Sequence, residues 1–213
     1  MNDHSLLQSL NEAQQKVVSA PQMHLLVLAG AGSGKTRVLV HRIAWLVNVE
    51  NISPHNILAV TFTNKAAGEM RHRLECLLDI PMKMMWVGTF HGLAHRLLRQ
   101  HWEAAGLIQT FKILDSDDKH RIIKRILTIL NLDEAQWAAK KVQWFINQQK
   151  DEGIRPHQIA NTQDPYTKTL IRIYQAYEDI CVRNGVIDFA ELILRSYDLF
   201  IKNPEILQHY QER

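Results

Sequence analysis

Cysteine is scarce in this sequence. Its 213 residues include two cysteines, Cys76 and Cys181, and these lie far apart. Two such residues build neither a disulfide framework nor a zinc site, so we expect the protein to work in a reducing compartment. Long hydrophobic runs are also absent, because the longest apolar stretch, around Leu25–Gly30, is far too short to cross a bilayer.

A signal peptide and a large excess of one charge are also lacking. The first residues are polar and amphipathic, without a basic start, an apolar core and a cleavage site. The 25 lysines and arginines stand against 22 aspartates and glutamates, a net charge of +3 that only weakly favours a polyanionic partner. We therefore expect a cytoplasmic protein with no membrane partner.

The sequence does contain enough apolar residues for a packed core. Hydrophobic residues make up 46% of the chain and charged residues 22%, which is typical of a globular protein and excludes wholesale disorder. A chain of 213 residues has room for one large domain or two small ones.

The first half of the chain alternates strand and helix signals. Leu25–Ala29 is a short apolar run closed by glycines, which predicts a buried parallel strand. Asn64 is the expected cap of a later helix. The expected strands are Leu25–Ala29, Ile57–Phe62 and Met85–Thr89, and the expected helices are Lys35–Asn48, Asn64–Leu78 and Phe90–Ala105. This order indicates an α/β fold with an open parallel sheet.

The second half has almost entirely helical periodicity. Helices are expected from a cap at Asp115 or Ser116 to about Leu130, and over Asp133–Gln149, Pro165–Asn184 and Asp188–Ile201. Trp137, Trp144 and Phe145 recur at helical spacing, which favours core positions for all three rings. We expect a boundary near residues 106–112 and a mostly helical second domain.

The most informative segment follows the first expected strand. It matches the phosphate-binding P-loop pattern with alanine in place of the first glycine, and it reads Ala29, Gly30, Ala31, Gly32, Ser33, Gly34, Lys35, Thr36. Such a turn exposes backbone N–H groups to phosphate oxygens, and the helix that starts near Lys35 adds its positive end. Lys35 is expected to reach the β- and γ-phosphates of ATP, and the Thr36 hydroxyl to ligate Mg²⁺. The alternative is a glycine-rich turn without a ligand.

The next residue, Arg37, has two interpretations from its position alone. Its guanidinium could stack on a nucleotide base or lie in solvent, and the sequence does not separate the two. The P-loop indicates a nucleotide-binding protein without saying which one, so a small-molecule kinase or another P-loop enzyme stays open at this point.

Four further motifs accompany the P-loop. They are Leu10–Gln14 before it, Thr61–Ala67 after the second expected strand, Val87–Gly92 after the third, and Val186–Leu192 near the end. In this order they resemble the N-terminal part of UvrD-like superfamily 1 DNA helicases, and the resemblance covers the whole chain. It implies ATP hydrolysis coupled to 3′-to-5′ movement on single-stranded DNA, with ATP and Mg²⁺ as cofactors. It also implies action at single-strand/double-strand junctions, and DNA repair proteins as partners.

The resemblance also implies an architecture. The fold should be a P-loop NTPase (RecA-like) parallel sheet, incomplete in this chain, followed by a mostly α-helical inserted subdomain. Residues 1–108 would be the N-terminal part of the RecA-like ATP-binding domain, 109–200 the helical insertion, and 201–213 the start of the return to the RecA-like domain.

Three residues are assigned to the nucleotide by the resemblance. Gln14 matches a glutamine that reads the adenine edge, for which an amide that both donates and accepts is suited. Arg37 matches an arginine that stacks against adenine. Arg73 either lines the nucleotide site or belongs to a solvated helix face.

The resemblance assigns a second set of residues to single-stranded DNA. These residues are Phe62, Thr63, Asn64, Thr89, Phe90, His91 and Phe189. Residues 62–64 and 89–91 each lie at the end of an expected strand or directly after it. Phe62 and Phe189 are suited to stacking on bases, and the short polar groups to phosphate or sugar contacts. The alternative places the phenylalanines in the core and leaves Asn64 as a cap only.

Hydrolysis also needs acidic groups for Mg²⁺ and for the attacking water. Asp133 and Glu134 follow an apolar run, but that run has helical spacing, so Asp133 is expected to cap the next helix. The family's acidic pair is expected beyond Arg213. The alternative function is therefore a truncated, non-catalytic module that binds ATP and DNA.

Overall fold

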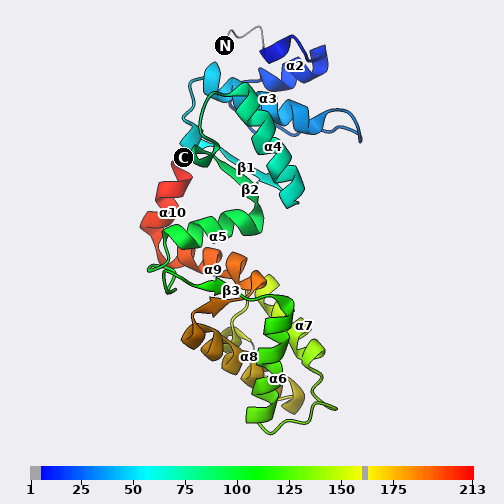
Figure 1. Cartoon of the computed structure of the whole chain (residues 1–213), viewed down its shortest axis with the longest axis vertical. Coiled ribbons are helices and arrows are strands. Elements are labelled where there is room, and N and C mark those ends of the chain that lie inside the picture. The colour runs from blue at the N-terminus through cyan, green and yellow to red at the C-terminus, as the bar shows by residue number, and fades with distance from the viewer. Residues whose placement is uncertain (1–5, 160–162) are drawn as a thin grey trace. The chain divides into compact units, whose positions relative to one another are not determined.

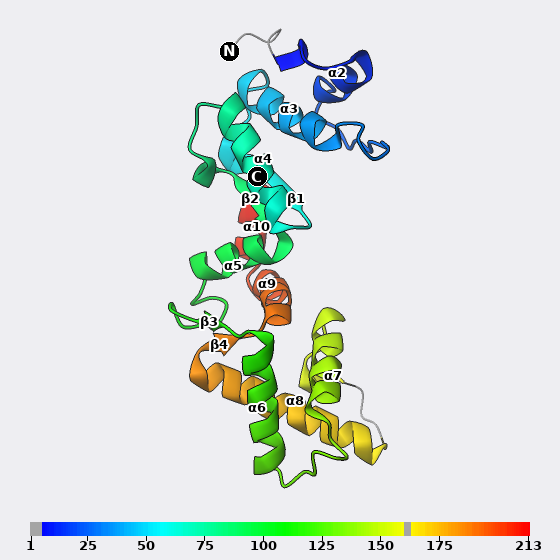
Figure 2. The same cartoon turned by 45° about the vertical axis from the view of Figure 1, so that its right-hand side comes forward.

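A computed structural model describes residues 6–159 and 163–213 of the chain. The described part is mostly helical with two small parallel sheets, each of two strands (Figures 1 and 2). It divides into two compact units: one runs through Leu93 and takes in Glu212 and Arg213, and the other runs from Ala94 to Gln211. Residues 1–5, the start of the amphipathic N-terminal segment, lie outside the described residues.

The first unit is built on the pair of strands β1 and β2. Its elements are α2 (Glu12–Val18), α3 (Lys35–Asn48), β1 (Leu58–Thr61), α4 (Asn64–Leu77), β2 (Trp86–Thr89) and the start of α5 (Phe90–Gln100), with short 3₁₀ turns at Pro54–Asn56 and Met82–Met84. β1 and β2 are parallel, and α4 connects them. Leu58 pairs with Trp86 and Thr61 with Thr89, so both strands end at the same edge of the sheet.

The core of this unit explains why α3 and α4 lie against the sheet. Ala59 of β1 and Val87 of β2 are buried, together with Ile43 of α3 and Met70 and Leu74 of α4. These helical residues recur at spacings that bring one apolar face of each helix toward the strands. The expected strands around Ile57–Phe62 and Met85–Thr89 and the helix Lys35–Asn48 are thus confirmed.

The expectation of a buried strand at Leu25–Ala29 is wrong. These residues form no strand, and Leu26 and Leu28 are 82% and 86% exposed. A strand needs a neighbour to pair its backbone groups, and neither sheet within residues 6–159 and 163–213 includes this segment. The expectation of Asn64 as a cap is also wrong, because Thr63 is the N-cap of α4 and its side chain accepts from the Ala66 N–H at 3.2 Å.

The second unit consists mainly of helices. They are α6 (Ser116–Ile129), α7 (Ala139–Asp151), α8 (Pro165–Asn184), α9 (Phe189–Lys202) and α10 (Pro204–Gln211), with a 3₁₀ turn at Pro156–Gln158 and the strands β3 (Lys112–Ile113) and β4 (Val186–Ile187). The expected bounds of α6, α8 and α9 are confirmed within about one residue. The caps are Asp115, Asp164 and Asp188, whose carboxylates each accept backbone N–H groups of the first turn.

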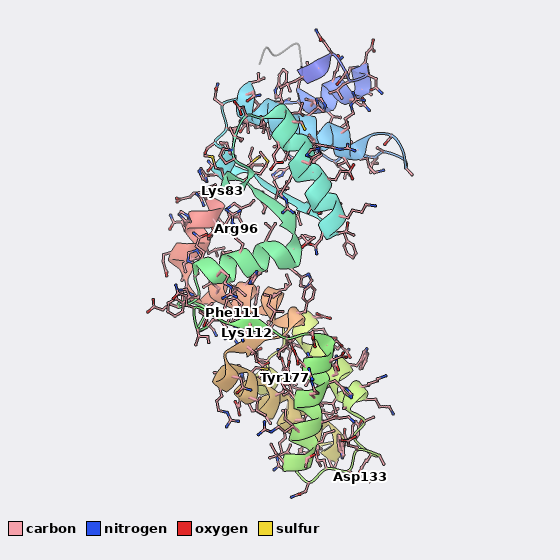
Figure 3. The ribbon with its side chains drawn as sticks, viewed as in Figure 1. Lys83, Arg96, Phe111, Lys112, Asp133 and Tyr177 are labelled. Atoms are coloured by element: carbon pink, nitrogen blue, oxygen red, sulfur yellow. The ribbon has the colours of Figure 1, made fainter. Side chains whose placement is uncertain are left out.

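The helix expected over Asp133–Gln149 starts six residues later than predicted. Asp133 does organise a turn, because its carboxylate accepts from the Ala135 N–H at 2.9 Å, but the non-helical backbone of Ala138 (φ −55°, ψ 120°) separates that turn from α7. Figure 3 marks Asp133 in the loop after α6. Trp144 is 67% exposed, so its expected core position is wrong, whereas Trp137 is buried and stacks on Tyr166.

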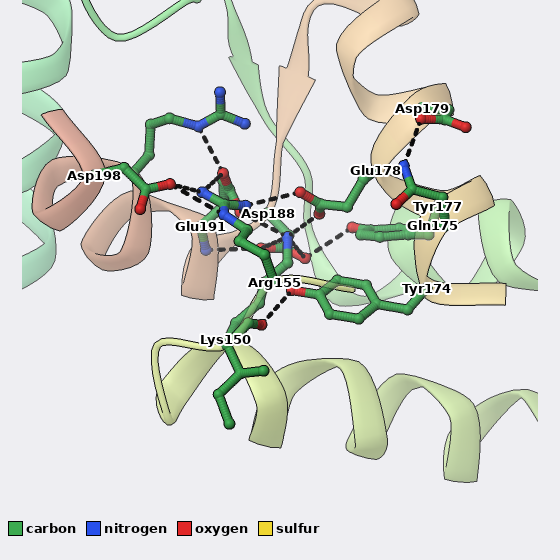
Figure 4. Close-up of polar contacts among 12 residues, drawn as sticks. Lys150, Arg155, Tyr174, Gln175, Tyr177, Glu178, Asp179, Asp188, Glu191 and Asp198 are labelled. Carbon is green, nitrogen blue, oxygen red and sulfur yellow. Dashed lines mark hydrogen bonds and ion pairs between the residues drawn. The ribbon is translucent and has the colours of Figure 1, made fainter. Parts of the chain in front are cut away.

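Charged side chains occupy the middle of the second unit (Figure 4). The Nζ atom of Lys150 lies 2.7 Å from Glu178, 2.9 Å from Glu191 and 3.2 Å from Asp188. Arg155 binds three carboxylates, those of Glu178, Glu191 and Asp198, at 2.6–2.9 Å. A buried charge is costly unless it is paired and hydrogen-bonded, and no buried side-chain polar atom of the described residues lacks a hydrogen-bond partner.

The carboxylates of this cluster make the free energy of unfolding depend on pH in the acid range. Burial alone would raise the pKa of Glu191, but Lys150, Arg195 and Arg155 outweigh it and hold that pKa below its ordinary value of 4.5. Burial would also raise the pKa of Asp188, but the positive charges of Lys150 and Lys119 outweigh it and lower that pKa. Carboxyls with lowered folded pKa values stabilise the fold above their unfolded pKa values and lose that contribution as pH falls.

We therefore expect the contribution of these carboxylates to the free energy of unfolding to be level between about pH 7 and pH 5.5 and to fall steadily below about pH 4.5. Urea unfolding followed by circular dichroism at a series of pH values measures this. Glu191→Gln should flatten the acid slope, and Glu205→Gln, an exposed carboxylate on α10, should leave it unchanged. A stability that stays level down to pH 3 would contradict the expectation.

None of the helices within the described ranges combines the length and the apolar character that crossing a membrane requires.

Candidate functional site: the phosphate loop and a sheet edge

Two glycines of the loop before α3 adopt left-handed backbone conformations. Gly32 and Gly34 have positive φ angles of 76° and 86°, a region that L-residues with side chains rarely adopt. Gly34 is the N-cap of α3, and a Cβ atom there would lie 3.0 Å from Gln14 Nε2. Glycine at position 34 is therefore needed twice, for the turn and for the close approach of Gln14.

Lys35 and Ser33 bind the carbonyl groups of their own loop. Lys35 Nζ donates to the oxygens of Ala29 at 3.0 Å and Gly30 at 2.6 Å, and Ser33 Oγ donates to Gly30 O at 2.8 Å. The ammonium group is thus held over the loop at the N-terminal end of α3, where the first N–H groups of a helix have no carbonyl partner within the helix. A positive charge beside free N–H groups suits an anionic ligand.

Gln14 comes to this loop from a helix 19 residues away in sequence. Its Nε2 donates to Ser33 O at 3.0 Å, while its Oε1 accepts the Asn11 N–H at 3.1 Å. Asn11 in turn accepts the Gln14 N–H at 2.9 Å, which completes a capping box at the start of α2. Asn11 is a residue that the sequence analysis missed, although the Asn-x-x-Gln spacing before a helix is the signal of such a box.

A cavity of about 550 Å³ opens beside the loop within the first unit. Its polar lining residues are Asn11, Gln14, Ser33, Lys35 and Arg42, and its apolar ones come from α2, from α3 and from the segment between them, namely Ala13, Val17, Met23, Leu25, Val27, Leu28, Ala29, Val38 and Leu39. A largely apolar cavity with a few convergent polar groups is the usual form of a small-molecule site.

The remaining expected nucleotide residues lie at the surface. Thr36 and Arg37 are exposed in the first turn of α3. Arg73 lies on α4, where its guanidinium pairs with Glu69 four residues earlier. Hydrogen bonds thus link Gln14 to the loop of residues 29–35. Arg73 instead forms an ion pair with Glu69, a residue of its own helix.

The two segments expected to contact DNA meet at one edge of the sheet. The parallel register places Thr61 opposite Thr89, so Phe62–Asn64 and Phe90–His91 leave the sheet side by side. Thr89 Oγ1 donates to Asn64 Oδ1 at 3.4 Å, and the Gly92 N–H donates to Thr89 Oγ1 at 3.2 Å. The Thr61 hydroxyl donates to Thr63 O at 3.1 Å, which fixes the turn into α4.

The aromatic side chains of these segments are exposed. Phe62 is 96% and Phe90 65% exposed, and Phe189, in the second unit, is 58% exposed. The alternative that placed them in the core is therefore wrong for all three. His91 is half-buried in the first turn of α5.

Comparison with known proteins agrees with these motifs. A model of the UvrD/REP helicase N-terminal domain matches residues 10–213. The chain is 59% identical to DNA helicase II of Escherichia coli over 98% of this chain and 29% of that relative. It is 54% identical to DNA helicase II of Haemophilus influenzae over 100% of this chain and 30% of that relative, and 38% identical to ATP-dependent DNA helicase PcrA of Bacillus subtilis over 99% and 29%. The chain therefore spans less than a third of the length of these relatives.

Proposed function

Because this chain belongs to the UvrD/REP helicase N-terminal domain family, we propose that it is the ATP- and DNA-binding portion of an ATP-dependent DNA helicase. The helicase moves 3′ to 5′ along single-stranded DNA, opens single-strand/double-strand junctions and serves in DNA repair in the cytoplasm. The relatives named DNA helicase II and ATP-dependent DNA helicase PcrA support this proposal. The complete activity belongs to a longer protein, since each of these relatives is more than three times as long as the matched part.

The proposed fold is a P-loop NTPase of the RecA type with a helical insertion. Residues 1–108 form the N-terminal part of the ATP-binding domain, 109–200 the insertion, and 201–213 the return to the first domain. The parallel β1–α4–β2 unit and the glycine loop before α3 support this assignment, because α/β sheets bind ligands at the carboxyl ends of their strands.

The proposed nucleotide is ATP with Mg²⁺. Gly30–Thr36 hold the phosphates through backbone N–H groups, Lys35 through its ammonium, and Thr36 supplies a hydroxyl to the metal. Gln14 reads the adenine edge and Arg37 stacks on the base, with Arg73 as a further nucleotide contact. Bound Mg²⁺ neutralises phosphate charge, and the hydrolysis of ATP supplies the free energy for movement on DNA.

The fit of the loop residues to these ligands rests on three observations. Gly32 and Gly34 adopt the left-handed backbone that directs N–H groups toward one side, and Lys35 is held over the loop by two carbonyls that a phosphate would outcompete for a cation. Gln14 is bonded to Ser33, so the proposed base contact and the phosphate loop are joined.

The proposed DNA site in the first unit consists of Phe62, Thr63, Asn64, Thr89, Phe90 and His91, and Phe189 of the second unit is a separate proposed DNA contact. The observation that carries this part is the nearly complete exposure of Phe62 at a sheet edge where Thr89 and Asn64 are hydrogen-bonded. An exposed aromatic ring beside short polar groups suits a base with its sugar and phosphate.

Phe62→Ala tests this proposal. We expect it to weaken binding of a fluorescein-labelled oligo(dT) by roughly 5- to 150-fold, the range of about 1–3 kcal/mol for one base stacked on an aromatic ring. Fluorescence anisotropy measures the affinity, and thermal unfolding should be unchanged because the ring is exposed. Ile129→Ala, an exposed apolar residue at the end of α6, is the control. Equal affinities of the two variants would count against the DNA assignment.

A second candidate is a module that binds ATP and DNA without hydrolysing ATP. The observation in its favour is that Asp133 and Glu134 have structural roles: Asp133 accepts the Ala135 N–H, and Glu134 pairs with Lys124 at 3.3 Å. DNA-stimulated hydrolysis of ATP by the longer protein, absent from its Lys35→Ala variant, separates the helicase motor from the module.

A further inference from the structure

The first turn of α9 joins a buried carboxylate to an exposed ring. Asp188 is 2% exposed and is the N-cap of α9, and its Oδ1 atom accepts the Glu191 N–H at 2.8 Å. Phe189, the next residue, is the first of the helix and is 58% exposed. The backbone from which this ring projects is therefore set by the carboxylate beside it.

Three helices supply donors to that carboxylate, and Figure 4 labels two of these donors, Lys150 and Tyr177. Asp188 Oδ2 lies 2.5 Å from Lys119 Nζ of α6, 3.2 Å from Lys150 Nζ of α7 and 2.9 Å from the Tyr177 hydroxyl of α8. Each of the three donors is buried, and Figure 3 labels Tyr177 on α8 in the interior of this unit. The start of α9 is thus held from three directions by hydrogen bonds of defined geometry.

The backbone that leads into Asp188 is held as well. β4 pairs with β3, and the Leu114 N–H donates to Ile187 O at 2.8 Å. Gly185 ends α8 with φ 61°, and a Cβ atom there would lie 2.2 Å from Ile108 Cδ1, so no other residue fits without displacing Ile108. Residues 185–188 are therefore fixed before the chain reaches Phe189.

Stability alone does not account for charges at this place. Well-packed apolar residues commonly replace a buried ion cluster without loss of stability. Charged groups differ from them in forming hydrogen bonds that fix the orientation of the groups they join. Two lysines and a tyrosine on one carboxylate specify where the helix begins in a way that apolar contacts, which are non-directional, do not.

We propose that Lys119, Lys150 and Tyr177 are positioning residues that act through Asp188 to fix the first turn of α9 and thereby hold the Phe189 ring ready to stack on a base of single-stranded DNA. The inference rests on the proposed function, in which Phe189 contacts DNA. It adds residues from α6, α7 and α8 that touch no DNA themselves and set the affinity of one ring.

A double-mutant cycle tests the proposal with labelled oligo(dT). Phe189→Ala should weaken binding roughly 5- to 150-fold, and Lys119→Met, which keeps the length of the side chain, roughly 3- to 30-fold. In the Phe189→Ala background Lys119→Met should have no further effect, because no ring is left to position. A purely structural lysine would instead cost the same factor in both backgrounds, and that result would overturn the proposal.

Tyr177→Phe gives a gentler variant that keeps the buried ring and removes one hydroxyl. It should show the same dependence on Phe189 with a smaller factor, while Lys168→Met, an exposed lysine on α8, shows none. Circular dichroism identifies variants that remain folded.

If the unchanged protein fails to bind oligo(dT), the proposed function itself fails. If it binds and Phe62→Ala weakens binding while Phe189→Ala or Lys119→Met does not, the positioning role alone is refuted.

Discussion

Replacing Lys35 with alanine is expected to weaken binding of ATP with Mg²⁺ roughly 10- to 150-fold. The ammonium group lies over the loop at the start of α3, bound to two backbone carbonyls, and it is the cationic side chain nearest in sequence to the glycine turn. A hydrogen bond to a charged group contributes about 1.5–3 kcal/mol, which corresponds to that range of affinity. Isothermal titration calorimetry of MgATP into the protein measures the difference.

The matched control is Lys16→Ala, an exposed lysine on α2 in the same unit. Both variants lose one exposed positive charge, so a general electrostatic effect would weaken both alike, and a phosphate-loop effect only Lys35→Ala. Thermal unfolding should be nearly unchanged in each. An ATP affinity of Lys35→Ala within twofold of the unchanged protein would refute the nucleotide assignment of this loop.

Replacing Lys150 with methionine is expected to destabilise the protein by about 3–5 kcal/mol. Its side chain is 1% exposed, and its Nζ atom pairs with three carboxylates that are themselves mostly buried. Without it, Glu178, Asp188 and Glu191 repel one another, with Lys119 and the arginines left to compensate. Lys119→Met removes the partner of one carboxylate, that of Asp188, and a hydrogen bond to Asn147 Oδ1, so it should cost less than Lys150→Met.

Urea unfolding followed by circular dichroism measures this difference in the free energy of unfolding. Lys140→Met, on the exposed side of the same helix, should change stability by less than about 0.5 kcal/mol. Equal stabilities of Lys150→Met and Lys140→Met would show that the cluster contributes no net pairing energy. The account of the second unit would then be wrong.

The helices were predictable where local chemistry decides them. α3 and α8 have the predicted bounds because Gly34 and Lys35 mark one start, Asp164 and Pro165 the other, and Gly185 the end of α8. The start of α7 was predicted too early because it depends on the non-helical backbone of Ala138, which apolar spacing does not reveal.

Two features could not be predicted because they depend on neighbouring segments of the folded chain: the absence of a strand at Leu25–Ala29 and the exposure of Trp144. The run Leu25–Ala29 has the composition of a strand, yet a strand exists only beside another strand, and periodicity says nothing about that neighbour. The exposure of Trp144 has the same origin, since its helical spacing fits a core residue but nothing within the described residues covers its ring.

The candidate site was predictable where it depends on short motifs. The P-loop and the two segments after β1 and β2 could be located because their residues are contiguous and a parallel sheet brings its strand ends together. The donors around Asp188 come from α6, α7 and α8, up to 69 residues away in sequence, and a buried lysine has no signature that distinguishes it from an exposed one. The sequence therefore predicts a role for Phe189 but gives no signal for the residues that hold the start of α9.

We propose that the first unit binds ATP at the glycine loop and single-stranded DNA at the edge formed by the ends of β1 and β2. Amide chemical-shift mapping by ¹H–¹⁵N NMR, with MgATP and oligo(dT) titrated separately into the protein, tests it most directly. We predict that MgATP shifts the amides of residues 30–36 and the side-chain amide of Gln14, and that oligo(dT) shifts residues 61–64 and 89–91. Shifts from either ligand that avoid these residues and gather elsewhere in the chain would contradict the account.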